Sequence, residues 1–151
     1  MTLEFSVSNY IKQHNSVMNS IDIAELESAI ELIRDKAFSG KKIAVCGNGG
    51  SALAASHYIT DWNKMVNLET GQRFNGVCLS DNVGLVTAYA NDLSYDDVFS
   101  EQVKNLLFPN DLLITVSNTT AHLSGAIGAE TWVMAPKSES LLFYWKISFI
   151  K

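Results

Sequence analysis

The fold is decided by Ile43-Ala44-Val45-Cys46-Gly47-Asn48-Gly49-Gly50-Ser51-Ala52, where an apolar run stops at Gly47 and a helical pattern begins at Ser51. The apolar run predicts a buried strand, and the small residues after it predict a tight turn. Glycines in such a turn allow positive φ and let a ligand approach the backbone closely. The turn leads into a helix N-terminus, where unpaired N–H groups and the helix dipole favour an anion. Ser51 can cap this helix or donate its hydroxyl to the anion, so the stretch predicts a phosphate site on an α/β sheet.

Two other interpretations of this loop stay open. The stretch also matches the G-x-G-x-x-A pattern of dinucleotide sites, which place an acidic residue about 20 positions later at the tip of the second strand. Here that window holds Asn67 and Glu69 in a polar connection. A tight turn that holds no ligand is the second possibility. A nucleoside triphosphate loop is excluded, because no Gly-Lys-Ser/Thr motif follows the glycines.

The composition is that of one globular domain. The chain has 151 residues, of which 47% are hydrophobic and 18% are charged. A net charge of −5 without a run of Lys or Arg argues against nucleic acid as a partner. Cys46 and Cys78 lie in apolar runs, which predicts buried thiols. Neither a signal-peptide pattern nor a membrane-spanning apolar run is present, so we expect a cytoplasmic protein that does not bind membranes.

Two amphipathic helices are predicted before the first strand, within residues 3 to 38. Apolar residues recur every three or four positions on both sides of a break at Ser20-Ile21-Asp22. Asp22 followed by Glu25 is a capping pattern, and Gly40 is a stop signal. The apolar stripes are wide for helices with one covered face. We therefore expect a helical hairpin, within residues 1 to 40, that packs on another subunit.

Strands and helices alternate along the rest of the chain. Strands are predicted at 43–46, 74–79, 112–116 and 131–135, and helices at 51–65, 83–89, 97–107 and 121–127. This order predicts a parallel sheet sandwiched by helices, with right-handed crossovers and a flavodoxin-like nucleotide-binding topology. The whole chain is predicted to be one domain, with a core at 41–117 and a βαβ tail at 118–151. The apolar segment 141–150 is expected to cover the sheet or a subunit contact.

Polar side chains follow two predicted strands and lie on the helix after the loop. Ser80-Asp81-Asn82 ends the second strand, and Ser117-Asn118-Thr119-Thr120 ends the third. Ligands of such sheets bind outside the carboxyl ends of the strands, so these groups favour a sugar-phosphate site. His57 and Asp61 are four residues apart and share a helix face. They can present an imidazole and a carboxylate to one metal ion or to one substrate proton.

Five separated motifs carry a family resemblance: Cys46-Gly47-Asn48-Gly49-Gly50-Ser51, His57, Leu79-Ser80-Asp81, Ala90-Asn91-Asp92 and Asp97-Val98-Phe99-Ser100. In this order and spacing they resemble the phosphoheptose isomerases over about residues 3 to 117. These SIS-domain enzymes convert sedoheptulose 7-phosphate to D-glycero-D-manno-heptose 7-phosphate for surface glycans. The resemblance implies an SIS-type fold and a homo-oligomer, a tetramer or a dimer, formed through residues 3 to 38. It also implies active sites that lie between subunits.

The resemblance implies roles for individual residues. The expected substrate-binding residues are Asn48, Gly49, Gly50, Ser51, Asn91, Asp92, Ser117, Asn118 and Thr119. His57 and Asp61 fall where the family has zinc ligands, the second of which is normally a glutamate that also moves protons. An aldose–ketose isomerisation needs a base and a group that polarises the oxygens, such as a metal. His57 and Asp61 are therefore the expected catalytic residues and zinc ligands.

After Val116 the sequence departs from this family. Residues 117 to 122 replace the family's second phosphate loop, and the 151 residues contain no counterpart of its later helix with a glutamine and a histidine. The alternative function is therefore a sugar-phosphate-binding module without catalysis. Residues 117 to 136 instead resemble the donor-binding segment of heptosyltransferase-type glycosyltransferases. This adds a third hypothesis, a glycosyltransferase accessory subunit that binds a nucleotide sugar.

Overall fold

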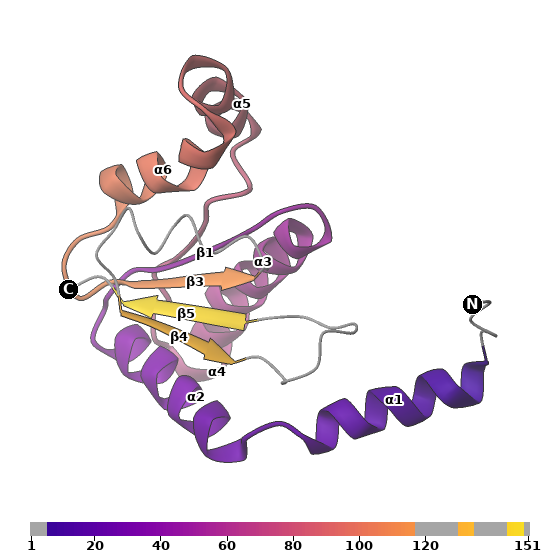
Figure 1. Ribbon diagram of the computed structural model, residues 1–151. Coiled ribbons are helices and arrows are strands. Elements are labelled where there is room, and N and C mark those ends of the chain that lie inside the picture. The colour runs from indigo at the N-terminus through magenta and orange to yellow at the C-terminus, as the bar shows by residue number, and fades with distance from the viewer. Residues whose placement is uncertain (1–5, 117–129, 135–144, 150–151) are drawn as a thin grey trace.

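A five-stranded sheet is the centre of the computed structural model, which describes residues 6–116, 130–134 and 145–149 (Figure 1). The strands are β1 (Ile43–Gly47), β2 (Gly76–Cys78), β3 (Leu112–Val116), β4 (Glu130–Met134) and β5 (Trp145–Phe149). Their order across the sheet is β2-β1-β3-β5-β4. β1 pairs in parallel with β2 on one side and with β3 on the other, which confirms the predicted parallel core.

The outer part of the sheet differs from the prediction. β5 pairs antiparallel with β3, and β4 pairs antiparallel with β5. The strand predicted at 131–135 is present as β4, but β5 separates it from β3. The segment 141–150 was expected to cover the sheet or a subunit contact, and it instead supplies β5 as a strand within the sheet. The pairing gives the backbone groups of β5 hydrogen-bond partners on both sides, which a covering segment would lack.

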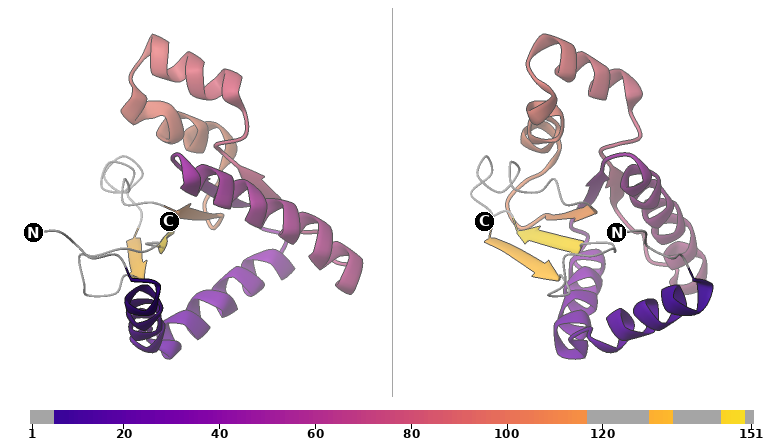
Figure 2. Two further views of the ribbon diagram at one scale, coloured as in Figure 1. Left: turned by 90° about the vertical axis from the view of Figure 1, so that its right-hand side faces the viewer. Right: turned by 45° about the vertical axis from the view of Figure 1, so that its right-hand side comes forward.

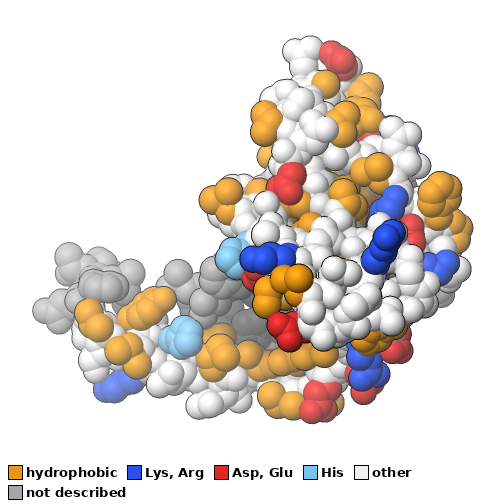
Figure 3. All heavy atoms as spheres, turned by 180° about the vertical axis from the view of Figure 1, so that it is seen from behind, with side chains coloured by type: hydrophobic (Ala, Val, Ile, Leu, Met, Phe, Trp, Pro, Cys, Tyr) orange, Lys and Arg blue, Asp and Glu red, His pale blue; other side chains and the backbone are white. Residues whose placement is uncertain are grey.

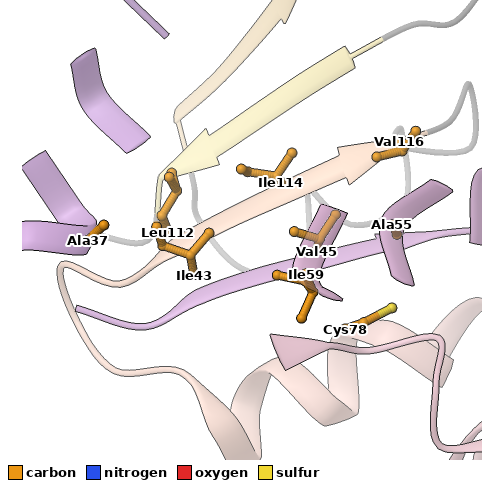
Figure 4. Close-up of a cluster of buried hydrophobic side chains, with 9 residues drawn as sticks. All are labelled: Ala37, Ile43, Val45, Ala55, Ile59, Cys78, Leu112, Ile114 and Val116. Atoms are coloured by element: carbon orange, nitrogen blue, oxygen red, sulfur yellow. The ribbon is translucent and has the colours of Figure 1, made fainter. Parts of the chain in front are cut away.

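Helices cover both faces of the sheet, as predicted (Figure 2). α2 (Ile23–Phe38) and α3 (Gly50–Asp61) lie on one face, and α6 (Val98–Leu106) lies on the other. Successive side chains of a strand point to opposite faces, and β1 follows this rule. Ile43 and Val45 join the cluster under α2 and α3, whereas Ala44 joins the cluster under α6. Figure 4 shows the first cluster: Ala37, Ile43, Val45, Ala55, Ile59, Cys78, Leu112, Ile114 and Val116.

Two helical segments run further than the sequence predicts. After α3 the chain continues as a π-helical turn, η1 (Trp62–Val66), and as α4 (Asn67–Thr70). The polar connection that holds Asn67 and Glu69 is therefore helical up to Thr70. α5 (Val83–Asp92) likewise extends beyond the helix predicted at 83–89, and a 3-10 turn, η2 (Tyr95–Asp97), joins α5 to α6. α5, η2 and α6 lie together on the side of the sheet opposite α2 (Figures 1 and 2).

Both N-terminal helices are confirmed, but they have different surroundings. Asp22 caps α2, because its Oδ1 accepts hydrogen bonds from the N–H of Ala24 at 2.9 Å and of Glu25 at 3.2 Å. α2 lies against the sheet of its own chain. α1 (Val7–Asn19) extends away from the sheet and contains no buried residue (Figure 1). Hydrophobic side chains are visible along α1 in Figure 3. Within the described ranges, no helix has the length and hydrophobicity needed to cross a membrane.

Gly47→Ala is expected to destabilise the fold. A Cβ at this position would lie 2.6 Å from the carbonyl oxygen of Ser51 and 2.7 Å from that of Val116. Both are backbone atoms, so α3 or β3 would have to shift, and we expect the free energy of unfolding to fall by about 2–3 kcal/mol. Urea unfolding followed by circular dichroism measures this loss.

Gly50→Ala is the matched control for Gly47→Ala. Nothing lies within 4 Å of a Cβ at Gly50, and the residue begins α3. Alanine is favoured over glycine in a helix, so the free energy of unfolding should stay within about 1 kcal/mol of the wild-type value or rise. Equal losses in the two variants would contradict the close contact between the loop and β3.

Candidate functional site

The loop between β1 and α3 presents an open helix N-terminus. Gly49 has φ 56° and ψ −126°, a conformation that strongly favours glycine, and no side chain caps α3. The N–H of Ser51 donates to the carbonyl oxygen of Asn48 at 3.0 Å. The N–H groups of Gly49 and Gly50 have no hydrogen-bond partner among the described residues, and both glycines are exposed. Two free donors at the start of a helix favour an anionic ligand, as the sequence predicts.

Ser80, in the turn that follows the neighbouring strand β2, fixes the start of this loop. Its Oγ accepts a hydrogen bond from the N–H of Gly47 at 3.2 Å and donates one to the carbonyl oxygen of Gly47 at 2.8 Å. Because β2 ends at Cys78, this hydroxyl satisfies the backbone groups of Gly47 on the side where the parallel ladder stops. The sequence marked Ser80 as well placed for function, and its observed contact is with the loop backbone.

Tyr95 contacts the loop from the layer of α5 and α6. Its hydroxyl donates to Oδ1 of Asn48 at 2.9 Å. The sequence did not indicate this residue, since a hydrogen bond between side chains 47 positions apart has no local pattern. The available signal was a single tyrosine two residues before the motif that starts at Asp97.

Asn91 and Asp92 lie at the exposed end of α5. Nδ2 of Asn91 donates to Oδ1 of Asp92 at 2.8 Å, so the two side chains bind each other. No hydrogen bond joins either of them to the loop within the described residues. The expected phosphate-binding residues Ser117, Asn118 and Thr119 lie outside the described residues.

His57 and Asp61 form a pair on the exposed side of α3. Nε2 of His57 lies 3.0 Å from Oδ2 of Asp61, and the side chains are 75% and 55% exposed. The predicted shared helix face is therefore confirmed. Among the residues that the structure describes, no third His, Cys, Asp or Glu joins them in a group that could hold a metal ion.

The two cysteines are not nucleophiles of this site. Both are buried and free, as predicted. Burial raises the pKa of the Cys46 thiol to about 12 and that of the Cys78 thiol to about 11. Because the thiolate is the reactive form, both side chains are inert at neutral pH.

Ser80→Ala is expected to lower the free energy of unfolding by about 1–2 kcal/mol, because it leaves the N–H and the carbonyl of Gly47 without their partner. Urea unfolding provides the measurement. Ser28→Ala is the control, since Ser28 is exposed on α2 and makes no hydrogen bond within the described residues, and its effect should stay within about 0.5 kcal/mol. If Ser80→Ala were as stable as the wild type, the proposed role of the Ser80 hydroxyl in holding the Gly47 backbone would be contradicted.

The relatives of this chain among known proteins include several phosphoheptose isomerases. The phosphoheptose isomerase of Shewanella denitrificans is 37% identical over 109 residues, which cover 69% of this chain and 55% of that protein. The phosphoheptose isomerase of Campylobacter concisus is 31% identical over 119 residues, which cover 78% of this chain and 62% of that protein. The chain thus spans between 55% and 62% of the length of these two relatives.

Solved structures and a family model agree with these relatives. A phosphoheptose isomerase from Neisseria gonorrhoeae is similar with a TM-score of 0.60 and 26% identity, over 82% of this chain and 70% of that one. One from Francisella tularensis has a TM-score of 0.69 at 20% identity, over 85% and 71% of the two chains, and shows likeness of fold alone. The model of the SIS domain matches residues 9–122. Because this match covers more than half of the chain, the protein belongs to the SIS domain family.

Proposed function

We propose that the chain binds a sugar phosphate at the loop from Gly47 to Ser51 and isomerises sedoheptulose 7-phosphate to D-glycero-D-manno-heptose 7-phosphate. The observation that carries the proposal is the uncapped start of α3, where the N–H groups of Gly49 and Gly50 have no partner among the described residues. A phosphate fits such donors and the positive end of the helix dipole. The choice of substrate is supported by relatives that are phosphoheptose isomerases.

The proposed isomerisation needs an acid–base group, and we assign this role to the pair His57 and Asp61 on α3. A base removes a proton from the carbon next to the ketose carbonyl while the carbonyl oxygen gains a proton, which gives an enediol. A proton then returns to the former carbonyl carbon while the hydroxyl on the neighbouring carbon loses its proton and becomes the aldehyde. We assign the proton transfer to the Asp61 carboxylate, which His57 contacts at 3.0 Å. Ser51 would bind the phosphate together with the loop. Asn48, Asn91 and Asp92 would contact substrate hydroxyls, and Ser117, Asn118 and Thr119 are proposed as further phosphate ligands.

We also propose His57 and Asp61 as zinc ligands, because zinc takes imidazole nitrogen and carboxylate oxygen. A zinc site needs four ligands, or three and a water, whereas the described residues offer these two. The others would come from a second copy of the chain or from residues outside the described ranges. Zinc would polarise the substrate oxygens. Metal analysis tests this assignment, which an equal zinc content of the wild type and His57→Gln would contradict.

We further propose that the chain is a homo-oligomer, a dimer or a tetramer, through residues 3 to 38. Four exposed apolar side chains on α1 support this surface: Val7, Tyr10, Ile11 and Met18. Contiguous apolar groups on a helix that extends from the body are typical of protein contacts. Light scattering of the intact chain tests the proposal, and a monomer at micromolar concentration would contradict it.

The cytoplasm is the expected compartment of the protein.

Sedoheptulose 7-phosphate is expected to raise the melting temperature and to be converted. At about 100 times the Kd, a ligand adds about 2.7 kcal/mol to the stability, which corresponds to roughly 5–10 °C for a domain of this size. Proton NMR of the same mixture detects the aldose. A rise in melting temperature without product would support the alternative, a binding module without catalysis. No rise with either the sugar phosphate or inorganic phosphate would contradict both functions.

Ser51→Asp separates binding from folding in this experiment. A carboxylate at the start of α3 interacts favourably with the helix dipole, so the melting temperature without ligand should be kept or raised. The same charge repels a phosphate, so the shift caused by sedoheptulose 7-phosphate should be lost. Ser51→Ala is the control without charge and should retain most of the shift. An undiminished shift in Ser51→Asp would place the phosphate elsewhere.

A further inference from the structure

We propose that Tyr95 is a positioning residue of the phosphate loop, which holds the Asn48 side chain with its amide NH₂ group directed to the ligand. This inference rests on the proposed sugar-phosphate function. It assigns a role to a residue outside the loop and outside the predicted site. The carrying observation is the hydrogen bond of 2.9 Å from the Tyr95 hydroxyl to Oδ1 of Asn48.

The two ends of the Asn48 amide have different partners. Oδ1 accepts the hydrogen bond from Tyr95, whereas Nδ2 has no partner among the described residues. An amide NH₂ group carries two donors, and an anionic or hydroxyl-rich ligand needs donors. The neighbouring free N–H groups of Gly49 and Gly50 favour the same kind of ligand. Asn48 therefore adds a side-chain donor to the backbone donors of the loop.

The Tyr95 hydroxyl improves Asn48 as a donor in two ways. The hydrogen bond restricts the rotation of the Asn48 side chain before the ligand arrives, which reduces the entropy lost on binding. It also forms a chain of hydrogen bonds from the hydroxyl through the amide to the ligand. The hydrogen bonds in such a chain polarise and strengthen one another. When the ligand accepts hydrogen bonds from Nδ2, the amide oxygen Oδ1 still needs a donor as its partner. The Tyr95 hydroxyl is that donor.

Tyr95 is itself held by the turn before α6. The hydroxyl of Ser94 donates to Oδ2 of Asp97 at 2.7 Å, which closes the turn around Tyr95. α6 is joined to the residue after β2, because the buried Nε2 of Gln102 donates to the carbonyl oxygen of Leu79 at 3.0 Å. The same Nε2 also donates to the carbonyl oxygen of Val98 within α6, at 3.0 Å. The backbone that carries the phenol thus has a defined position relative to β2 and the loop.

The exposure of Tyr95 indicates that its hydroxyl, rather than its ring, is the functional part. The residue is 59% exposed and belongs to neither of the buried clusters. An exposed aromatic ring contributes little to the stability of the fold. Removal of the hydroxyl alone should therefore change ligand binding while the fold is retained.

The test is a double-mutant cycle with Tyr95→Phe, Asn48→Ala and the double variant. The Kd for sedoheptulose 7-phosphate is measured by calorimetry on the intact chain, and urea unfolding is measured on each variant. Tyr95→Phe should weaken binding about three- to tenfold in the wild-type background, the effect of one hydrogen bond. It should cause no further loss in the Asn48→Ala background, and its unfolding midpoint should equal that of the wild type.

Tyr89→Phe is the matched control. Tyr89 lies on α5, and its hydroxyl makes no hydrogen bond within the described residues, so its removal should leave the Kd unchanged. Equal effects of Tyr95→Phe in the two backgrounds, or a lower unfolding midpoint, would indicate a general structural role and overturn the inference. An unchanged Kd in Tyr95→Phe would overturn it as well. Absence of binding by the wild type would instead overturn the proposed function, and the inference with it.

Discussion

The close contacts of the Gly47 backbone are the constraint on which the site depends. On one side, the carbonyl of Val116 in β3 approaches so closely that a side chain at Gly47 would have no room. On the other side, Ser80 binds both the N–H and the carbonyl oxygen of Gly47. The residue is also part of β1, which is buried along its whole length. The loop that follows therefore leaves the sheet in one direction, and its free N–H groups are arranged before any ligand arrives.

The fold supports the two parts of the proposed function, phosphate binding and proton transfer, to different degrees. The loop proposed to bind the anion is held by the buried strand β1 and by hydrogen bonds from Ser80 and Tyr95. The acid–base part, His57 and Asp61, lies exposed on α3 and forms a pair that solvent can reach. Proton transfer benefits from a site closed to water, so catalysis needs more surrounding structure than phosphate binding does. Binding is accordingly the more direct consequence of the described residues.

Local sequence patterns were sufficient for the centre of the fold. The apolar run at 112–116 predicted the observed bounds of β3, which is buried at every position, and the capping pattern at Asp22 predicted the start of α2. The insertion of β5 could not be predicted, since a short apolar run fits a strand, a helix or a covering segment, and its partner lies far away in the chain. The contact between Tyr95 and Asn48 was missed for the same reason, because long-range side-chain pairs depend on the assembled layers. The loop motif predicted the free helix N-terminus, which depends only on neighbouring residues.

The most direct test of this account is an amide NMR titration of the intact chain with sedoheptulose 7-phosphate. If the uncapped start of α3 binds the phosphate, the backbone amides of Gly49 and Gly50 should show the largest saturable shifts, because their N–H groups would gain a charged acceptor. The Asn48 side-chain amide should shift with them. Saturable shifts centred on another part of the chain, with Gly49 and Gly50 unchanged, would contradict the account.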